Sequence, residues 1–274
     1  MALNPLSEVG ANPSLETRDG PSLSEVDVSS DYGTPNLLFL YYIPYIPSSA
    51  KPAMDELKED LWSWHAWELA QAEKQVKRQI DSGNLPVDDS VASRIKRTNY
   101  RAKVVQALRD TSEVWQQVYD ERKSSWGPVD VKKGEENGVI GEQLRRRYLT
   151  EAGLPQPLSV LLNVVNPTIA TDTQAGSKYF FSHSYLKYDE AAKGFQPDIR
   201  ATTFSVTQKA KEEGDESTAT VKISYDDYKI RFDRALWAEQ RQLAKDVIEE
   251  GMAILKVTSL SFFIDVSNAV SGSI

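Results

Sequence analysis

The chain has only two histidines and no cysteine, so few of its side chains suit metal binding or acid–base chemistry. His65 lies within Trp62-Ser-Trp-His-Ala-Trp67, and Glu68 follows three residues later. A metal site needs further ligands in register, and no second histidine-rich segment supplies them. We therefore interpret His65 as part of an aromatic cluster where a helix enters the core, and we predict no metal site.

His183 is flanked by two hydroxyl groups, those of Ser182 and Ser184. A catalytic triad places its nucleophile in a distant, strained turn and not beside the base in a strand. Side chains alternate between the faces of a strand, so both serines point away from the histidine. We interpret His183 as a structural strand residue.

Adjacent carboxylates occur five times, but adjacent acids on a helix or strand mostly point apart, whereas catalysis needs carboxylates that converge on a cleft. Only Asp226-Asp227 interrupts an alternating strand, and a β-bulge explains this interruption as well as a functional role does. No Gly-x-Gly-x-x-Gly, phosphate-binding loop or Gly-x-Ser-x-Gly motif is present. We predict no cofactor and no enzymatic activity. The pairs are Glu59-Asp60, Asp88-Asp89, Glu212-Glu213, Asp226-Asp227 and Glu249-Glu250.

Two basic clusters offer a possible phosphate-facing patch. The first would share one helix face, and the second is a run of three arginines. The net charge of −8 argues against unaided nucleic-acid binding, because cationic side chains must replace counterions. Pairing with neighbouring acids, or with an acidic arm of another subunit, is the favoured alternative. The residues are Arg94, Arg97 and Arg101 in the first cluster and Arg145, Arg146 and Arg147 in the second.

Residues 199–232 predict one long β-hairpin with a charged tip at 209–217. Each arm alternates apolar with polar side chains and is longer than a typical strand. A hairpin of this length is typical of intersubunit contacts or of membrane insertion. A membrane strand needs about 9–11 residues with one continuous apolar face, and the Thr, Gln and Lys residues here favour a protein contact. The candidate contact residues are Phe204, Val206, Val221 and Ile223.

The elements that would carry these residues begin with a buried strand at 37–46. A helix follows from Pro52 to Gly83, and a second helix begins at Asp88-Asp-Ser90 and ends at Gly127-Pro128. The short connection predicts an antiparallel helical hairpin. Beyond it we expect a helix at 140–152, strands at 158–170 and 178–188, the long hairpin, a helix at 234–250 stopped by Gly251, and a strand at 253–266.

These elements predict an α+β fold, with a long antiparallel helical hairpin followed by an antiparallel β-sheet, one packed helix and a long β-hairpin. We divide the chain into an extended N-terminal arm (1–36), a strand plus helical hairpin region (37–153) and an antiparallel β-rich region (154–274). The arm is rich in Pro, Ser, Gly and acids, so it needs a neighbouring chain to order it.

The combination of arm, long hairpin, acidic surface and missing catalytic motifs predicts a non-enzymatic structural subunit of a homo-oligomer, such as a virion, capsid or phage tail. Nucleic-acid contact is a lesser alternative. A soluble pore-forming toxin that oligomerises on membranes is the main alternative, and an enzyme with an unrecognised site is the second. We find no signal peptide and no transmembrane segment, so we expect an intracellular protein at synthesis, or a component of a virion or particle.

Overall fold

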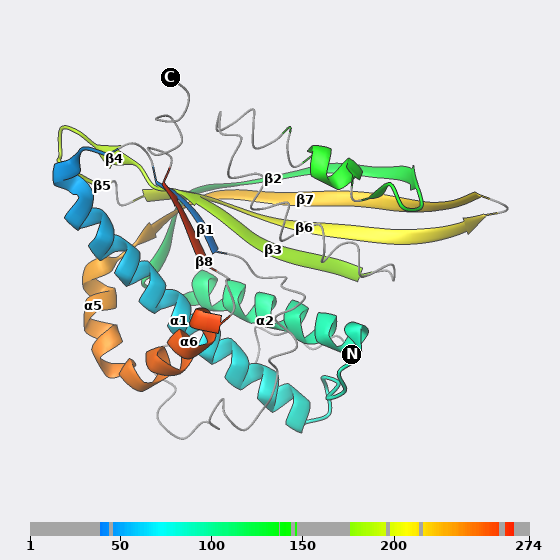
Figure 1. Cartoon of the computed structure of the whole chain (residues 1–274), viewed down its shortest axis with the longest axis horizontal. Helices are drawn as coiled ribbons and strands as arrows, with labels where there is room; N and C mark the ends of the chain where they lie inside the picture. The colour runs from blue at the N-terminus through cyan, green and yellow to red at the C-terminus, as the bar shows by residue number, and fades with distance from the viewer. Residues whose placement is uncertain are drawn as a thin grey trace.

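The computed structural model describes residues 39–43, 46–136, 138–143, 146, 176–195, 198–213, 216–257 and 261–265. They form an α+β fold in which a group of helices lies beside a mostly antiparallel sheet (Figure 1). The predicted fold class is therefore confirmed. None of the described helices combines the length and the apolar character that a bilayer crossing requires. The expected N-terminal arm (1–36) and the expected strand at 158–170 lie outside the described residues.

The main sheet has six strands in the order β2-β7-β6-β3-β1-β8. The four strands from β2 to β3 are antiparallel, whereas β1 pairs in parallel with both β3 and β8. The prediction of an antiparallel sheet was therefore wrong at the edge formed by β1 and β8. The bounds are β1 Phe39–Ile43, β2 Trp115–Lys132, β3 Gly176–Tyr185, β6 Asp198–Glu213, β7 Glu216–Phe232 and β8 Ser261–Asp265. A separate two-stranded sheet consists of β4 Tyr188–Asp189 and β5 Gly194–Phe195.

Helix α1, Lys51–Asp81, follows the short 3₁₀ turn η4, Ser48–Ala50. It packs against three other helices, α2, α5 and α6. A short connection leads to α2, Val91–Thr111, and the chain folds back on itself there as expected (Figure 1). Ser90 caps α2 by accepting a hydrogen bond from the Ser93 backbone N–H, as predicted. Hydrogen bonds from Ser90 and Ser93 hold the pKa of the Asp88 carboxyl at about 2.

The second helix is much shorter than its sequence pattern predicts. It ends at Thr111, and the chain continues as strand β2, so the expected helix end at Gly127-Pro128 was wrong. Trp115 and Tyr119 fit helical spacing by coincidence, because both pair across the sheet with β7. Gly127 instead lies at a β-bulge between Trp126 and Val129. Its φ of +86° and a gap of only 2.5 Å between an added Cβ and a backbone oxygen of β7 both require glycine there.

The C-terminal helix is divided in two. Helix α5 runs over Arg234–Leu243 and α6 over Lys245–Val257, and Ala244 is buried between them. Gly251 therefore lies inside α6 and is not a helix stop. The residues from Ala253 to Val257, expected to begin a strand, are helical, and the structure describes strand β8 over Ser261–Asp265.

The sheet serves two separate cores on its two faces. The β6–β7 register pairs Ile199 with Ile230 and, further along, Phe204 with Tyr225 and Val206 with Ile223. Residues an odd number of positions apart point to opposite faces of a regular strand. Ile199 and Ile230 join the core of the helical layer, so Phe204 and Val206 face the other side of the sheet, where they are also buried.

Strand β2 comes from the expected central region, yet it is hydrogen-bonded along its length to β7 from the expected C-terminal region. Helix α1 likewise packs against α6. The boundary that we placed after residue 153 therefore falls between segments that share one sheet and one core.

Candidate functional site

The long hairpin is the candidate interaction element. Strands β6 and β7 contain 16 and 17 residues and stay paired from Asp198–Arg231 to Glu213–Glu216. A typical strand has about 5–6 residues. At roughly 3.3 Å per residue, each arm spans on the order of 50 Å. The strands therefore extend well past the helices to the tip of the molecule (Figure 1).

The structure places the four apolar contact candidates of this hairpin inside the chain. Phe204, Val206, Val221 and Ile223 are all buried, and Tyr225 lies beside them. Ile140, in the helical residues 138–143 that follow β2, is fully buried as well. These side chains form the second core of the sheet and are not exposed to a partner. The accessible part of the hairpin is its opposite face.

That opposite face is polar over the distal half of the hairpin. Ser205 pairs with Ser224, Thr207 with Lys222, and Lys209 with Thr220. Lys209 and Lys222 are exposed, and the hydroxyl-bearing residues between them are partly exposed. Strand β2 extends alongside as far as the Lys132–Thr218 pair. Hydroxyl and ammonium groups, together with the exposed carboxylate of Asp130, which accepts from Thr220 Oγ1 at 2.6 Å, form a three-stranded polar surface here.

The first arginine cluster is structural and does not form a phosphate-facing patch. Arg97 is buried and donates from Nη1 to the backbone carbonyls of Pro86, at 2.8 Å, and Asp88, at 2.9 Å. Arg101 is buried against Glu73, with Nη2 3.0 Å from Oε2. Arg94 is partly buried. Arg101 is thus paired with an acid of the same chain, the alternative that we favoured over a phosphate-facing patch, and Arg97 and Arg101 tie α2 to the preceding turn and to α1.

The second cluster is only partly described. Arg146 is exposed and its Nε lies 2.9 Å from Glu142 Oε1, one helical turn earlier. Arg145 and Arg147 lie outside the residues whose side chains are described. The described member therefore matches the alternative of a solvated arginine paired with a nearby acid.

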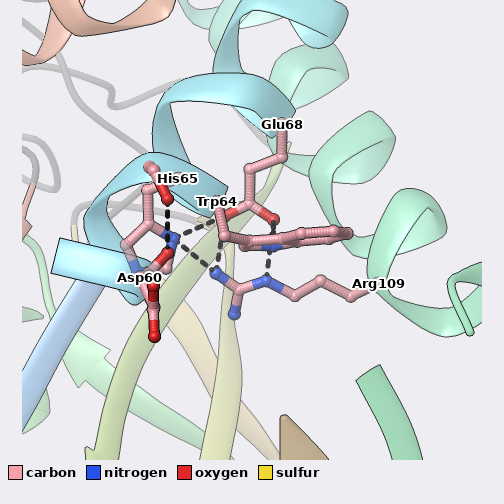
Figure 2. Close-up of polar contacts among 6 residues, drawn as sticks. Asp60, Trp64, His65, Glu68 and Arg109 are labelled. Atoms are coloured by element: carbon pink, nitrogen blue, oxygen red, sulfur yellow. Dashed lines mark hydrogen bonds and ion pairs between the residues drawn. The ribbon is translucent and has the colours of Figure 1, made fainter. Parts of the chain in front are cut away.

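A network of buried polar side chains connects α1 to α2, and the sequence pattern gave little indication of it (Figure 2). Glu68 is its centre. Arg109 approaches both carboxylate oxygens, with Nη2–Oε1 at 2.7 Å and Nε–Oε2 at 3.0 Å. Trp64 Nε1 donates to Oε2 at 2.8 Å, and His65 Nδ1 lies 2.8 Å from Oε1. Because the carboxylate accepts, the neutral imidazole carries its proton on Nδ1.

Burial sets the ionisation of this network. It holds the pKa of His65 below its usual value, against the raising effect of Glu68, so the ring is neutral near pH 7. Burial alone would raise the pKa of Glu68. The charge of Arg109 and the hydrogen bonds from His65 and Arg109 outweigh burial, and the Glu68 pKa lies below its usual value. The network is therefore an ionised carboxylate–guanidinium pair with a neutral histidine.

The surroundings of the network indicate a structural role. Trp64 contacts the rings of Trp67 and Trp237 at centroid distances of 4.8 and 5.0 Å, and His65 and Glu68 are fully buried. The aromatic cluster that we predicted around His65 is thus present. No group of three metal-ligating side chains forms among the described residues.

The other acidic candidates also have specific partners. Asp60 pairs with Arg234 at 2.6 Å and with Arg241 at 2.9 Å, which fixes α5 on α1. Asp227 accepts from Thr202 Oγ1 at 2.6 Å across the hairpin. The β6–β7 register is unbroken at Asp227, whereas on the other edge of β7 the register with β2 shifts between Tyr119 and Arg122, the partner of Asp227. The irregularity expected near Asp226-Asp227 is therefore present in the β2–β7 pairing. His183 lies in β3 opposite Leu40 and Thr202 in the backbone register, and nothing further is described of its side chain.

Comparison with known proteins gives no family. No family model matches the chain, and no curated protein matches it. Among solved structures, that of the Evf virulence factor is similar to this chain, with 10% sequence identity and a TM-score of 0.42. The match covers 95% of this chain and 94% of that one. A likeness of this degree carries no inference about function.

Proposed function

We propose that the chain is a non-enzymatic structural subunit that assembles with copies of itself, as in a virion or tail particle, through the distal part of its long hairpin. The observation that supports this most is the extent of β6 and β7 beyond the helical layer (Figure 1). Ile199, Ile230 and Phe232, at the proximal ends of these strands, belong to the helical core, whereas the distal parts extend beyond it. These distal parts place a polar, three-stranded surface where a neighbouring subunit can reach it.

The distribution of apolar residues supports a contact with protein. The apolar side chains of the hairpin already have an intramolecular core, so the surface left for a partner is polar, with hydroxyl groups, two ammonium groups and the carboxylate of Asp130. Non-obligate protein interfaces contain many hydrogen bonds at their polar parts. A net charge of −8 also leaves acidic groups elsewhere on the chain to meet Lys209 and Lys222 of a neighbour.

A pore-forming toxin is the second candidate. The observation in its favour is that Phe204, Val206, Val221, Ile223 and Tyr225 share one face of the hairpin. If this face left its core, it would offer an apolar stripe to a bilayer. The stripe includes Gln208 and is shorter than the roughly 9–11 residues that a membrane strand needs, so the assembly reading is preferred.

The proposal is tested by shortening the hairpin in register. Because Lys209 pairs with Thr220, replacing residues 210–219 by Asn-Gly joins a matched pair through a favourable two-residue turn. Light scattering gives the mass of the parent and of the shortened protein over a concentration series, and circular dichroism reports folding. We expect an oligomeric parent and a folded variant that assembles more weakly, because the shortening removes the distal end of the hairpin but keeps the pairs from Ser205–Ser224 to Lys209–Thr220. A parent that stays monomeric would overturn the proposal, and so would full assembly of both the shortened protein and the charge-reversed variant of the retained surface described next.

Charge reversals provide a matched pair that leaves the strands intact. Lys222→Glu changes the distal polar surface, whereas Lys229→Glu changes an exposed lysine of the same strand nearer the helices. We expect only the first substitution to weaken assembly. Release of dye from liposomes by the parent, abolished in the shortened protein, would support the toxin and contradict the structural subunit.

A further inference from the structure

A pocket of about 510 Å³ opens at the end of the molecule away from the hairpin tip. Its wall comes from the beginning of α1, from β5, and from the stretch where β7 ends and α5 begins. Small-molecule sites in proteins typically have volumes of about 300–1,000 Å³. The strand β6 begins at this pocket and ends at the tip, so the pocket is separate from the proposed interaction surface.

The floor of the pocket is apolar and well packed. Leu57 of α1, Ile199 of β6 and Phe232 of β7 are all buried. Phe195 of β5 is partly exposed and meets Tyr188 edge to face at a centroid distance of 5.5 Å. Two aromatic rings and two branched aliphatic side chains suit a flat, apolar ligand body.

Two arginines lie at the same pocket, and carboxylates hold both in place. Arg231 uses Nε and Nη2 to contact Asp198, with Nη2–Oδ1 at 2.9 Å. Arg234 uses Nε for Asp60 at 2.6 Å and directs Nη2 towards Glu56 at 3.6 Å. Among the residues that the structure describes, the contacts of both guanidiniums use Nε and Nη2, so Nη1 of each is available to a ligand. Because the ion pairs fix both side chains, a ligand pays little conformational entropy to engage them.

The groups that would bind an anion in the pocket are the guanidinium N–H donors of Arg231 and Arg234, and not a net positive charge. Three guanidiniums, those of Arg231, Arg234 and Arg241, lie near four carboxylates, those of Glu56, Asp60, Asp198 and Asp233. Asp60 is shared between Arg234 and Arg241, and Glu56 is mostly exposed and therefore screened. The third charged residue of the wall, Asp233, accepts from the Leu236 backbone N–H and caps the N-terminus of α5.

From these contacts we propose that the pocket binds a small organic anion: an aromatic body against Leu57, Phe195 and Phe232, and one carboxylate, sulfonate or phosphate group on Arg231 and Arg234. Guanidinium groups suit all three anions because their paired N–H groups match the geometry of the anion oxygens. The proposal is independent of self-assembly, because either can fail while the other holds.

The test compares three probes with the same ring system: 2-naphthoate, 2-naphthalenemethanol and 2-naphthylmethylamine. Isothermal titration calorimetry on the full chain measures each dissociation constant. We expect 2-naphthoate to bind at least roughly tenfold more tightly than the neutral alcohol, and the cationic amine to bind most weakly. Equal affinity for acid and alcohol, preference for the amine, or no binding of 2-naphthoate at millimolar concentration would overturn the proposal.

Variants locate the site. Arg231→Gln and Arg234→Gln each remove one guanidinium from the wall, and we expect roughly tenfold weaker binding of 2-naphthoate in each case. Arg241→Gln is the control for Arg234→Gln, because it also removes a partner of Asp60 but does not line the pocket. It should bind like the parent. Equal losses of affinity in Arg234→Gln and Arg241→Gln would show that binding depends on Asp60 and its packing, and would contradict a direct contact between Arg234 and the ligand.

A second variant avoids the ion pairs. Ala53 is partly exposed on the first turn of α1 and lines the pocket, so Ala53→Phe fills the space without removing a contact. Ala238→Phe places the same side chain on an exposed position of α5 outside the pocket. Loss of 2-naphthoate binding in the first variant alone supports the assignment. Retained binding in Ala53→Phe contradicts it.

Discussion

Gly251 of α6 lies directly against the backbone of Ala66 in α1. A Cβ built on Gly251 would stand 1.7 Å from the Ala66 carbonyl oxygen and 2.8 Å from its Cα. The two helices therefore cross at backbone contact, with no room for a side chain. This crossing explains how α1 can be buried on several sides, because α6 comes as close to it as helices can. It also explains why a glycine lies inside a helix, where it is otherwise unfavourable.

Gly251→Ala should be strongly destabilising, because the methyl group meets backbone atoms that cannot rotate away. We expect a loss of at least about 1–3 kcal/mol in the free energy of unfolding, the range for overpacked sites. Urea denaturation followed by circular dichroism measures it. Gly138→Ala is the control, since Gly138 lies among helical residues with no atom near its added Cβ. Its stability should stay equal or rise slightly, and equal behaviour of both variants would contradict the close crossing.

Trp64→Ala should cost about 3–5 kcal/mol of stability, as for large aromatic residues in cores. Trp64 is almost fully buried and contacts Trp67 and Trp237, so its removal leaves a cavity between helices α1 and α5 and strands β2 and β7. Trp64→Phe keeps most of the ring but loses the hydrogen bond to Glu68, and it should cost less. Chemical denaturation of both variants checks the order. A cost below about 1 kcal/mol for Trp64→Ala would show that the site is not core.

Arg97→Ala should destabilise the protein without any effect specific to nucleic acid. Its buried guanidinium donates to the carbonyls of Pro86 and Asp88, and losing hydrogen bonds from a charged group costs roughly 1–3 kcal/mol. Arg146→Ala, at an exposed pair with Glu142, should change stability by less than about 1 kcal/mol. Thermal unfolding measures both. Salt-dependent binding of duplex DNA or RNA by the parent that disappears in Arg97→Ala would restore the phosphate-patch interpretation.

The α+β class and the start of each long helix follow from the sequence, because caps and periodicity are local signals. Ser90 and Pro52 mark helix starts in the sequence, and the structure places both at the start of a helix. The end of α2 could not be predicted in the same way. Trp115 and Tyr119 continue the helical spacing, and only the tertiary pairing of β2 with β7 makes them strand residues. Pairing between segments a hundred residues apart leaves no local signature.

The candidate sites were likewise predictable from the sequence only where the signal is local. An alternating pattern in the hairpin correctly indicates that Phe204 and Ile223 share a face, but it cannot say whether a partner or the chain itself covers that face. The arginines of α2 have helical spacing, and charge alone suggests a solvated patch. Their true partners, Glu73 for Arg101 and Glu68 for Arg109, lie on α1, a buried helix whose many charged residues conceal its burial in the sequence.

The buried network also predicts how stability depends on pH. The folded-state pKa of His65 lies below 6.5, its usual value. As pH falls below about 6.5, His65 binds a proton in the unfolded chain but not in the folded chain, so the free energy of unfolding decreases as pH falls. The Glu68 pKa is also lowered, from 4.5, so its stabilising contribution is present above that value and is lost as pH falls through the lower folded pKa. Both effects act in the same direction but in successive pH ranges.

His65→Gln should therefore flatten the pH dependence of stability below about pH 6.5. As pH falls through this range the parent should lose stability through His65, because only its unfolded chains bind the extra proton. The measurement is the free energy of unfolding in urea at several pH values. Trp64→Phe is the control, because it perturbs the same cluster without removing a group that titrates in this range, and its curve should run parallel to that of the parent. Parallel curves for the parent and His65→Gln would mean that His65 gains its proton equally in both states, and the neutral, buried imidazole would have to be abandoned.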